Sequence, residues 1–315
     1  MNETLADAGE FALIERVTAD VVRGPQVLVG PGDDAAVLSV DGALVASTDV
    51  FVEHVHFRTD WSSAEDVGHK AIAAAVADIE AMGAIPTGVL IAFSAPKTTQ
   101  ASWVEQCVAG ALAECADAHV SLVGGDLSGG QCVSLAVTAL GQTGGNTPIL
   151  RSGARAGDAV AYKGRLGWAA AGLAVLSRGF RSPRMAVQAY QRPQVPYGAG
   201  LEAFKNGATA LIDTSDGLMA DLGHIAQASG VVIDIDFGCL DIPDVIAAVA
   251  QASGHDVRDF ILGGGEDHAL VGTFGWGEVP STWTVIGQVV PADNQDPAVL
   301  LDGQTWLGER GWSHF

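Results

Sequence analysis

Aspartate side chains recur in short motifs rich in glycine, serine and threonine, which makes carboxylate chemistry the first function to consider. Hard divalent cations such as Mg²⁺ take oxygen ligands, usually a few carboxylates together with water and phosphate oxygens. Aspartate suits a tight turn because its short side chain holds its position. The motifs are GPGDDAAV (30–37), STDVFVEHVHF (47–57), VADIEAMG (76–83), VGGDLSGG (123–130) and DTSDG (213–217).

Four of these motifs are predicted to place an aspartate beside the end of a strand, where α/β proteins bind ligands. Asp78 is the exception, because its motif predicts a helix in which Ala74 and Ala75 leave room for an ion. Of the adjacent pair Asp33–Asp34, we favour Asp34 as the residue that faces a metal. Each motif has a simpler interpretation as a turn or a helix cap, since aspartate is common in both.

Two further segments carry polar groups that could contact a ligand. The three glycines of LGGGEDHAL (262–270) permit close backbone approach to a ligand beside Glu266 and Asp267, although a flexible loop that enters a strand is the alternative. His54 and His56 stand two residues apart in a segment that we expect to be extended, so both should point to one face. A pair of surface histidines is the alternative.

The charge balance limits the kind of partner. The formal net charge is −21 with only 16 lysines and arginines, which argues against nucleic acid or an anionic membrane surface. A phosphate ligand would be repelled unless divalent cations accompany it. The chain has no GxxxxGK[ST] motif to hold phosphates. The helix expected after DTSDG would add backbone N–H groups and a positive helix end.

The spacing of apolar residues predicts an alternation of strands and helices over the first 140 residues. Ser62 and Glu65 form a capping-box pattern that opens a helix running to about Met82. The segment GQTGGNTP (141–148) predicts the boundary between an N-terminal domain (1–145) and a C-terminal domain (146–315). In the C-terminal part we expect strands at 158–163, 208–212, 231–236, 268–274 and 283–290, with helices at 217–229, 241–252 and between 166 and 205.

The N-terminal residues lack the basic start and apolar core of a signal peptide, and no run reaches the roughly 18 apolar residues of a membrane helix. The four cysteines form no CxxC pair. We therefore expect a cytoplasmic protein with reduced thiols.

The same motifs resemble thiamine-monophosphate kinases in order and spacing. The resemblance covers nearly the whole chain, from Gly9-Glu10-Phe11 to the terminal GWSHF, and includes GDDAAV, LRSGARAGD, DTSDGLxxDLGHI and GGGEDHAL. It implies an aminoimidazole-ribotide synthetase-like α/β (α+β) protein, with a ferredoxin-like or related N-terminal sheet domain that forms a homodimer. It also implies a C-terminal α/β sandwich domain that completes a cleft for ATP and thiamine monophosphate.

The resemblance also implies roles for individual residues. The Mg²⁺ ligands would be Asp34, Ser47, Thr48, Asp49, Asp78, Asp126, Asp213 and Asp216. The contacts to ATP would be Gly125, Asp126, Arg151 and Ser215. The contacts to thiamine phosphate would be His56, Glu266 and Trp312. The segment 101–118 has no tyrosine, where some relatives place an aromatic residue against adenine.

The reaction expected from this resemblance is direct in-line transfer of a phosphoryl group from ATP, with several Mg²⁺ ions and no phosphoenzyme. Three alternatives stay open at this point. They are another ATP-using enzyme of the aminoimidazole-ribotide synthetase type, a metal-dependent phosphohydrolase, and a non-enzymatic sensor of Mg²⁺ and nucleotide.

Overall fold

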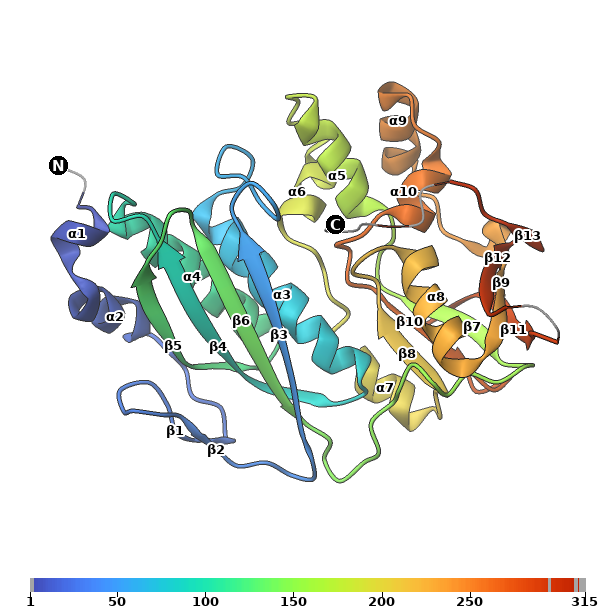
Figure 1. Ribbon diagram of the computed structural model, residues 1–315, viewed down its shortest axis with the longest axis horizontal. Helices are drawn as coiled ribbons and strands as arrows, with labels where there is room; N and C mark the ends of the chain where they lie inside the picture. The colour runs from blue at the N-terminus through green and yellow to red at the C-terminus, as the bar shows by residue number, and fades with distance from the viewer. Residues whose placement is uncertain (1–2, 294–295, 309–310, 312–315) are drawn as a thin grey trace. The chain divides into compact units, whose positions relative to one another are not determined.

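The computed structural model describes residues 3–293, 296–308 and 311, and it divides into two compact units. Unit 1 comprises residues 1–79 and 85–146, and unit 2 comprises residues 80–84 and 147–315. Both units are mixed α/β structures, as the sequence predicts (Figure 1). Within the described ranges, no helix combines the length and apolar character needed to cross a bilayer.

Unit 1 is built on a four-stranded sheet with the strand order β3-β6-β4-β5. Strands β3 and β4 are parallel to each other because both pair antiparallel with β6, and β5 is parallel to β4. The elements are α1 (Leu5–Ala8), α2 (Glu10–Thr18), β1 (Val27–Val29), β2 (Val37–Leu38), β3 (Leu44–Val52), α3 (Ala64–Ala81), β4 (Ile85–Ala95), α4 (Ala101–Asp117), β5 (Ser121–Gly129) and β6 (Ser134–Gln142).

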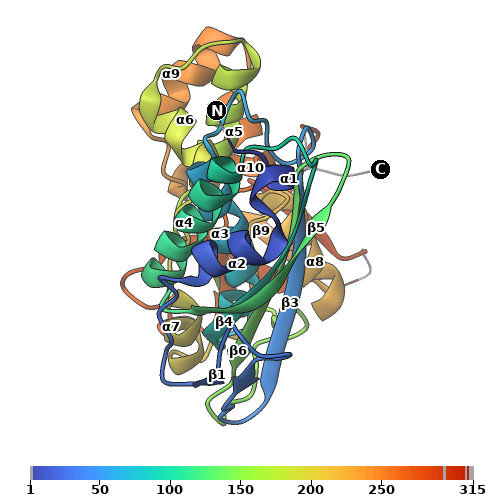
Figure 2. The ribbon, with the colours of Figure 1, turned by 90° about the vertical axis from the view of Figure 1, so that its left-hand side faces the viewer.

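The insertion of β6 between β3 and β4 is the split βαβ arrangement found in ferredoxin-like folds. The order along the chain is nevertheless βαβαββ, since both helices precede β5. Helices α3 and α4 lie on one side of the sheet (Figure 2). Glycines let these helices approach closely, because a Cβ atom on Gly68 would lie 1.9 Å from the carbonyl oxygen of Cys107.

The opposite face of this sheet is open. Along β3 the burial alternates, with Phe51 buried on the helix side and Leu44 and Val50 more than half exposed on the other side. This alternation is what a strand shows when only one of its faces is covered. The open face therefore presents apolar side chains to solvent.

The capping box of α3 lies one residue later than the sequence pattern predicts. The Ser63 hydroxyl accepts a hydrogen bond from the backbone N–H of Asp66 at 3.2 Å, and the Asp66 carboxylate accepts one from the N–H of Ser63 at 2.9 Å. The predicted pair Ser62–Glu65 has the same spacing, so the sequence pattern fits both pairs equally. Buried Ser62 instead packs its hydroxyl without a hydrogen-bond partner among the described residues.

The described residues of unit 2 form a seven-stranded sheet with the order β13-β12-β9-β11-β7-β10-β8. The β12–β9 pair is parallel, and the other pairs between described strands are antiparallel. Its strands are β7 (Ala159–Lys163), β8 (Ala210–Asp213), β9 (Val231–Ile235), β10 (Leu270–Phe274), β11 (Thr284–Pro291), β12 (Ala298–Leu301) and β13 (Gln304–Thr305). Its helices are α5 (Trp168–Ser177), α6 (Arg184–Gln191), α7 (Ala199–Lys205), α8 (Leu218–Ser229), the 3₁₀ helix η1 (Phe237–Cys239), α9 (Asp244–Ser253) and α10 (Val257–Gly263).

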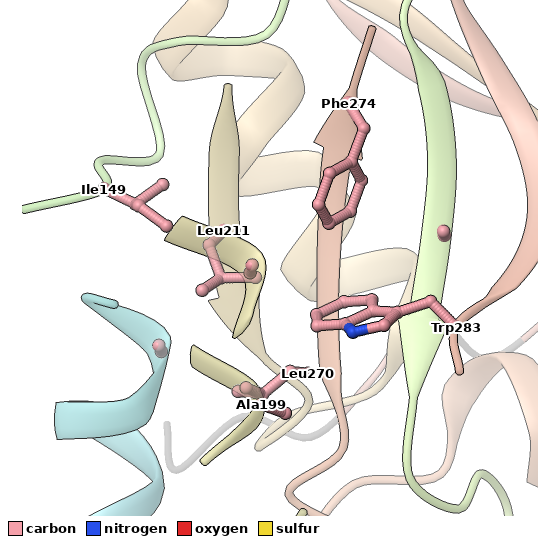
Figure 3. Close-up of a cluster of buried hydrophobic side chains, with 9 residues drawn as sticks. Ile149, Ala199, Leu211, Leu270, Phe274 and Trp283 are labelled. Atoms are coloured by element: carbon pink, nitrogen blue, oxygen red, sulfur yellow. The ribbon is translucent and has the colours of Figure 1, made fainter. Parts of the chain in front are cut away.

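A core cluster of unit 2 surrounds the Phe274 and Trp283 rings, whose centroids are 5.2 Å apart in an edge-on arrangement (Figure 3). Ala81 packs into this cluster, which is why residues 80–84 belong to unit 2. Glu80 also links this segment to unit 2 through hydrogen bonds. Its buried carboxylate accepts hydrogen bonds from the backbone N–H groups of Gly198 at 2.8 Å and Gly200 at 2.9 Å. These bonds cap the start of α7.

Candidate active site

Unit 1 brings three of its predicted metal ligands to the helix-covered side of the sheet. The Ser47 hydroxyl on β3 donates a hydrogen bond to the Asp78 carboxylate on α3. Asp49 is two residues beyond Ser47 on the same strand, so its side chain points to the same face. Ser47, Asp49 and Asp78 therefore offer hard oxygen atoms from one strand and one helix.

Thr48 and Asp126 are placed differently. The Thr48 hydroxyl lies on the open face, where it donates to the carbonyl oxygen of Val137 at 3.2 Å. Asp126 is exposed on β5, which is the edge strand opposite β3 and three strand spacings of about 4.8 Å away from it. Within one sheet, these two side chains are thus not brought together with the group around Asp78.

The expectation that aspartates lie beside strand ends is wrong for Asp49 and Asp126. Asp49 lies inside β3, and Asp126 lies inside β5, which continues to Gly129. The pairing of β5 with β4 extends through the glycine-rich segment because glycine allows close strand contact. A Cβ atom on Gly125 would lie 2.1 Å from the carbonyl oxygen of Ile91, so this glycine is required by the sheet itself.

Asp34 lies in the exposed connection between β1 and β2. Its backbone N–H donates to the side chain of Asp33 at 2.8 Å, so Asp33 stabilises the turn. Of the two adjacent carboxylates, Asp33 therefore has the structural role, and the role of Asp34 as a ligand stays a prediction.

His56 lies in a tight turn after β3, and the prediction of an extended segment is wrong there. His54 adopts a left-handed backbone conformation with φ 70°, which turns the chain. The Nδ1 atom of His56 accepts a hydrogen bond from the N–H of Val52 at 3.0 Å, so a neutral His56 ring carries its proton on Nε2. Buried Lys70 on α3 donates a hydrogen bond to the His56 carbonyl oxygen at 3.3 Å and so stabilises the turn.

In unit 2 the DTSDG segment joins the end of β8 to the start of α8. Asp213 is the last residue of β8 and is buried, whereas Ser215 and Asp216 are partly exposed. Gly217 is the N-cap of α8, and no side chain of the described residues caps the first N–H groups of this helix. Oδ2 of Asp221 in the first turn instead holds the preceding turn, because it accepts hydrogen bonds from the N–H groups of Asp216 at 3.1 Å and Gly217 at 3.0 Å. Neither Asp213 nor Ser215 therefore caps this helix.

Negative charge accumulates around Asp221. Burial, which is the largest cause, and the nearby charges of Asp213 and Asp216 together raise the pKa of its carboxyl group to about 7, against the effect of the two backbone hydrogen bonds. Ligand atoms of Asp216, Asp221 and His224 all lie within 4.8 Å of one another. A divalent cation would relieve this repulsion, and the oxygen-rich donor set fits a hard ion such as Mg²⁺.

The GGGEDHAL loop packs against DTSDG through backbone hydrogen bonds. The N–H of Glu266 donates to the carbonyl oxygen of Ser215 at 2.8 Å, and that of His268 donates to Thr214 at 3.1 Å. A Cβ atom on Gly265 would lie 2.4 Å from the Ser215 carbonyl oxygen. The glycine here thus allows two backbone segments to meet, and partly exposed Glu266 is held beside Ser215 and Asp216.

The remaining predicted contacts are less constrained. Arg151 is exposed, and its carbonyl oxygen accepts a hydrogen bond from the Ser229 hydroxyl at 2.9 Å, which holds its backbone near the end of α8. Trp312 lies outside the described residues. The roles of both residues stay predictions.

Sequence reasoning missed three groups at this site. Asp221 and His224 stand three residues apart on α8, a spacing that places both on one helix face next to Asp216. His268 contacts Asp213, and only the pairing of β8 with β10 brings the two residues together. The helical spacing of the first two was visible in the sequence, but the contact of the third was not.

Unit 1 gives the class of domain, because it contains an AIR synthase-related N-terminal domain. Residues 32–143 match the family model described as AIR synthase related protein, N-terminal domain. The structure is similar to the thiamine-monophosphate kinase of Stenotrophomonas maltophilia K279a, with a TM-score of 0.81 and 31% identity over 95% of this chain and 98% of that one.

A curated thiamine-monophosphate kinase of Mycobacterium tuberculosis is 46% identical over 99% of this chain and 93% of its own length. A ThiL protein solved with AMPPCP and TMP is 30% identical, with a TM-score of 0.78 over 98% of this chain and 97% of that one. The chain therefore belongs to the thiamine-monophosphate kinase family.

Proposed function

We propose that this protein transfers the γ-phosphoryl group of ATP to the phosphate of thiamine monophosphate, producing ADP and thiamine diphosphate. The observation that carries this proposal is the 46% identity to a thiamine-monophosphate kinase along nearly the whole chain. The similar ThiL protein solved with AMPPCP and TMP supports ATP and thiamine monophosphate as the two substrates. A backbone hydrogen bond holds Glu266 beside Ser215 of DTSDG. This contact supports a site in which a residue that we assign to thiamine monophosphate lies next to one that we assign to ATP.

Mg²⁺ is the cofactor that the acidic side chains fit. Bound Mg²⁺ would neutralise the phosphate oxygens and the charge that develops during in-line transfer. In unit 1, Ser47 orients Asp78 beside Asp49, and Asp34 contributes from the β1–β2 connection. In unit 2, Asp213 and Asp216 are the ligands, and Asp221 holds the turn between them and α8. Thr48 and Asp126 stay in the proposed set of ligands, although the sheet of unit 1 does not bring their side chains together with Asp78.

The residues need not remove a proton from the acceptor. The second pKa of a phosphomonoester is about 6, so the attacking oxygen is already largely deprotonated at neutral pH. A bond forms between this oxygen and the γ-phosphorus, while the bond from the γ-phosphorus to the bridging β–γ oxygen breaks and ADP leaves. The work of the protein is therefore to position two anions. We assign Gly125, Arg151 and Ser215 to ATP, and His56, Glu266 and Trp312 to thiamine phosphate.

The open face of the unit 1 sheet supports a homodimer. Leu44 is 58% exposed and Val50 is 52% exposed on this face, and apolar side chains on an uncovered sheet face fit an interface with a second copy of the chain. The four cysteines are all unpaired, which supports a reducing, cytoplasmic environment.

One assay tests the proposed reaction. The protein is incubated with ATP, Mg²⁺ and thiamine monophosphate, while ADP, inorganic phosphate and thiamine diphosphate are measured. We expect ADP and thiamine diphosphate in equal amounts, only when the acceptor is present. Release of inorganic phosphate without the acceptor would indicate a phosphohydrolase, and no turnover would indicate a binding protein. Either result would contradict the proposal.

A further inference from the structure

A buried histidine contacts one of the proposed metal ligands in unit 2. The Nδ1 atom of His268 lies 3.0 Å from Oδ2 of Asp213. The two side chains are only 8% and 4% exposed, so water cannot easily replace this contact. His268 was not among the residues that the sequence motifs assign to substrate, nucleotide or metal.

The chemistry of the pair fixes the direction of the hydrogen bond. An ionised carboxylate only accepts, so the Nδ1 atom of His268 carries the hydrogen that it donates to Asp213. This bond holds the Oδ2 atom and leaves Oδ1 as the oxygen that can face a cation. Histidine and carboxylate partners of this kind orient the groups that bind a metal directly.

The backbone around His268 keeps its ring in place. The N–H of His268 donates to the carbonyl oxygen of Thr214 at 3.1 Å, and the N–H of Thr214 donates to that of Ala269 at 2.8 Å. The Thr214 hydroxyl also accepts from the N–H of Ala269 at 3.0 Å. His268 has a left-handed backbone with φ 51°, and Glu266 has φ 64°. These hydrogen bonds to Thr214, the neighbour of Asp213, hold the strained turn that contains Glu266 and His268.

We infer that His268 is a positioning residue that orients Asp213 for binding a divalent cation. The inference rests on the proposed function, because it takes Asp213 as a metal ligand. His268 also lies two residues from Glu266, which we assign to thiamine phosphate. The same turn therefore positions both His268, the partner of Asp213, and Glu266. A purely structural histidine would instead contribute to folding without affecting cation affinity.

Two substitutions separate the hydrogen bond from the bulk of the ring. The amide nitrogen of asparagine occupies about the position of Nδ1, so His268→Asn can still donate to Asp213. Asparagine also tolerates a positive φ. The amide nitrogen of glutamine reaches the position of Nε2, so His268→Gln loses that donor. Exposed His119 has a similar φ of 56°, so His119→Gln is the matched control for the same change on a left-handed backbone.

Binding of Mn²⁺, used in place of Mg²⁺, is measured by the electron paramagnetic resonance signal of the free ion in the presence of AMPPCP. For His268→Gln we expect Mn²⁺ affinity to fall by about 10-fold to 100-fold. His268→Asn should stay within about threefold of the unaltered protein, because it keeps the donor. His119→Gln should leave the affinity unchanged. If His268→Gln does not fold, His268→Gly removes the ring and relieves the positive φ, and the same loss of affinity is expected.

Asp213→Asn distinguishes the two ways in which the inference can fail. If this variant loses Mn²⁺ affinity while the glutamine or glycine variant of His268 does not, His268 has no positioning role and the ligand role of Asp213 stands. If Asp213→Asn also binds Mn²⁺ normally, the assignment of Asp213 as a ligand is wrong and the inference fails with it.

Discussion

The carboxylate of Asp267 accepts a hydrogen bond from the backbone N–H of Ala169 at 2.8 Å through Oδ1, at the start of α5. Its Oδ2 atom is buried without a hydrogen-bond partner among the described residues. Burial raises the pKa of this carboxyl group to about 7, against the opposing effect of its backbone hydrogen bonds. Asp267 therefore holds α5 beside the Glu266 loop while keeping an ionisable group out of water.

This carboxyl group should make the stability of the metal-free protein depend on pH. Its pKa is higher in the folded state than in the unfolded state, where it is about 3.9. The group therefore stabilises the fold most below about pH 4, and this contribution is lost as the pH rises to about 7. Each pH unit in this window changes the free energy of unfolding by at most about 1.4 kcal/mol per group.

The comparison with Asp267→Asn isolates this effect from other titrating groups. The melting temperature of both proteins is measured in a chelator between pH 4 and pH 8. We expect the unaltered protein to lose several degrees relative to the variant as the pH rises, and then to show a constant difference above about pH 7. A difference that is the same at all pH values would contradict a raised pKa for Asp267.

Asp78→Asn should remove most of the kinase activity while leaving the fold intact. The substitution keeps the shape of the side chain and an oxygen that accepts the hydrogen bond from the Ser47 hydroxyl. It removes the negative charge that we propose binds Mg²⁺. We expect the turnover rate to fall by about a hundredfold or more at saturating Mg²⁺. The control is Asp117→Asn, which changes an exposed aspartate at the end of α4. Near-normal turnover of Asp78→Asn would show that Asp78 does not bind the metal.

Glu266→Gln should affect the acceptor more than the nucleotide. Glu266 is held beside Ser215 by a backbone hydrogen bond, so the substitution removes the side-chain charge without releasing the loop. We expect the KM for thiamine monophosphate to rise by about 10-fold or more, with a smaller change in the KM for ATP. Initial rates at varied concentrations of each substrate provide the test, with the exposed Glu278→Gln as control. Equal changes in both KM values would remove Glu266 from the acceptor site.

Glu80→Ala should destabilise unit 2. Burial raises the pKa of Glu80 in spite of its two hydrogen bonds, and the alanine variant leaves the N–H groups of Gly198 and Gly200 without their acceptor. Gly198 is exposed, so water can bind its N–H, whereas Gly200 is buried. One unsatisfied buried donor costs about 1–3 kcal/mol, and we expect a loss of about that size. Denaturant unfolding measures this loss against Glu15→Ala, an exposed glutamate of α2. A loss as small as that of the control would mean that the cap is unimportant.

Glu80 also shows what the sequence could and could not predict. The spacing of apolar residues correctly predicts the helix that carries Asp78 and Glu80, because that pattern is local. It treats these two acids alike, although Glu80 caps α7 at a sequence separation of 120 residues. The strand that carries Asp126 likewise extends to Gly129 because of its pairing with β4. Such long-range partners decide which acid is structural, and a local pattern does not contain them.

In the unit 2 site, too, some features follow from the local sequence and others depend on distant contacts. Glycine and aspartate in DTSDG correctly predict the turn before α8, since Gly217 has a positive φ of 129° that few other residues adopt. The side chain that holds this turn is nevertheless Asp221, which accepts hydrogen bonds from the N–H groups of Asp216 and Gly217 just before the helix. The contact of His268 with Asp213 depends on the antiparallel register of β8 and β10. Residue types therefore predicted the local turn, whereas the individual partners depend on contacts between distant segments.

The open sheet face of unit 1 should control the oligomeric state. Val50→Glu places a charge among the exposed apolar side chains of β3, and burying that charge in an interface would cost several kcal/mol. We expect the unaltered protein to have twice the 32.2 kDa mass of one chain in light scattering after size exclusion, and the variant to shift towards the single-chain mass. Val22→Glu is the matched control, because Val22 is 80% exposed but lies outside the sheet. If Val50→Glu stays as dimeric as Val22→Glu, the dimer interface lies outside this sheet face.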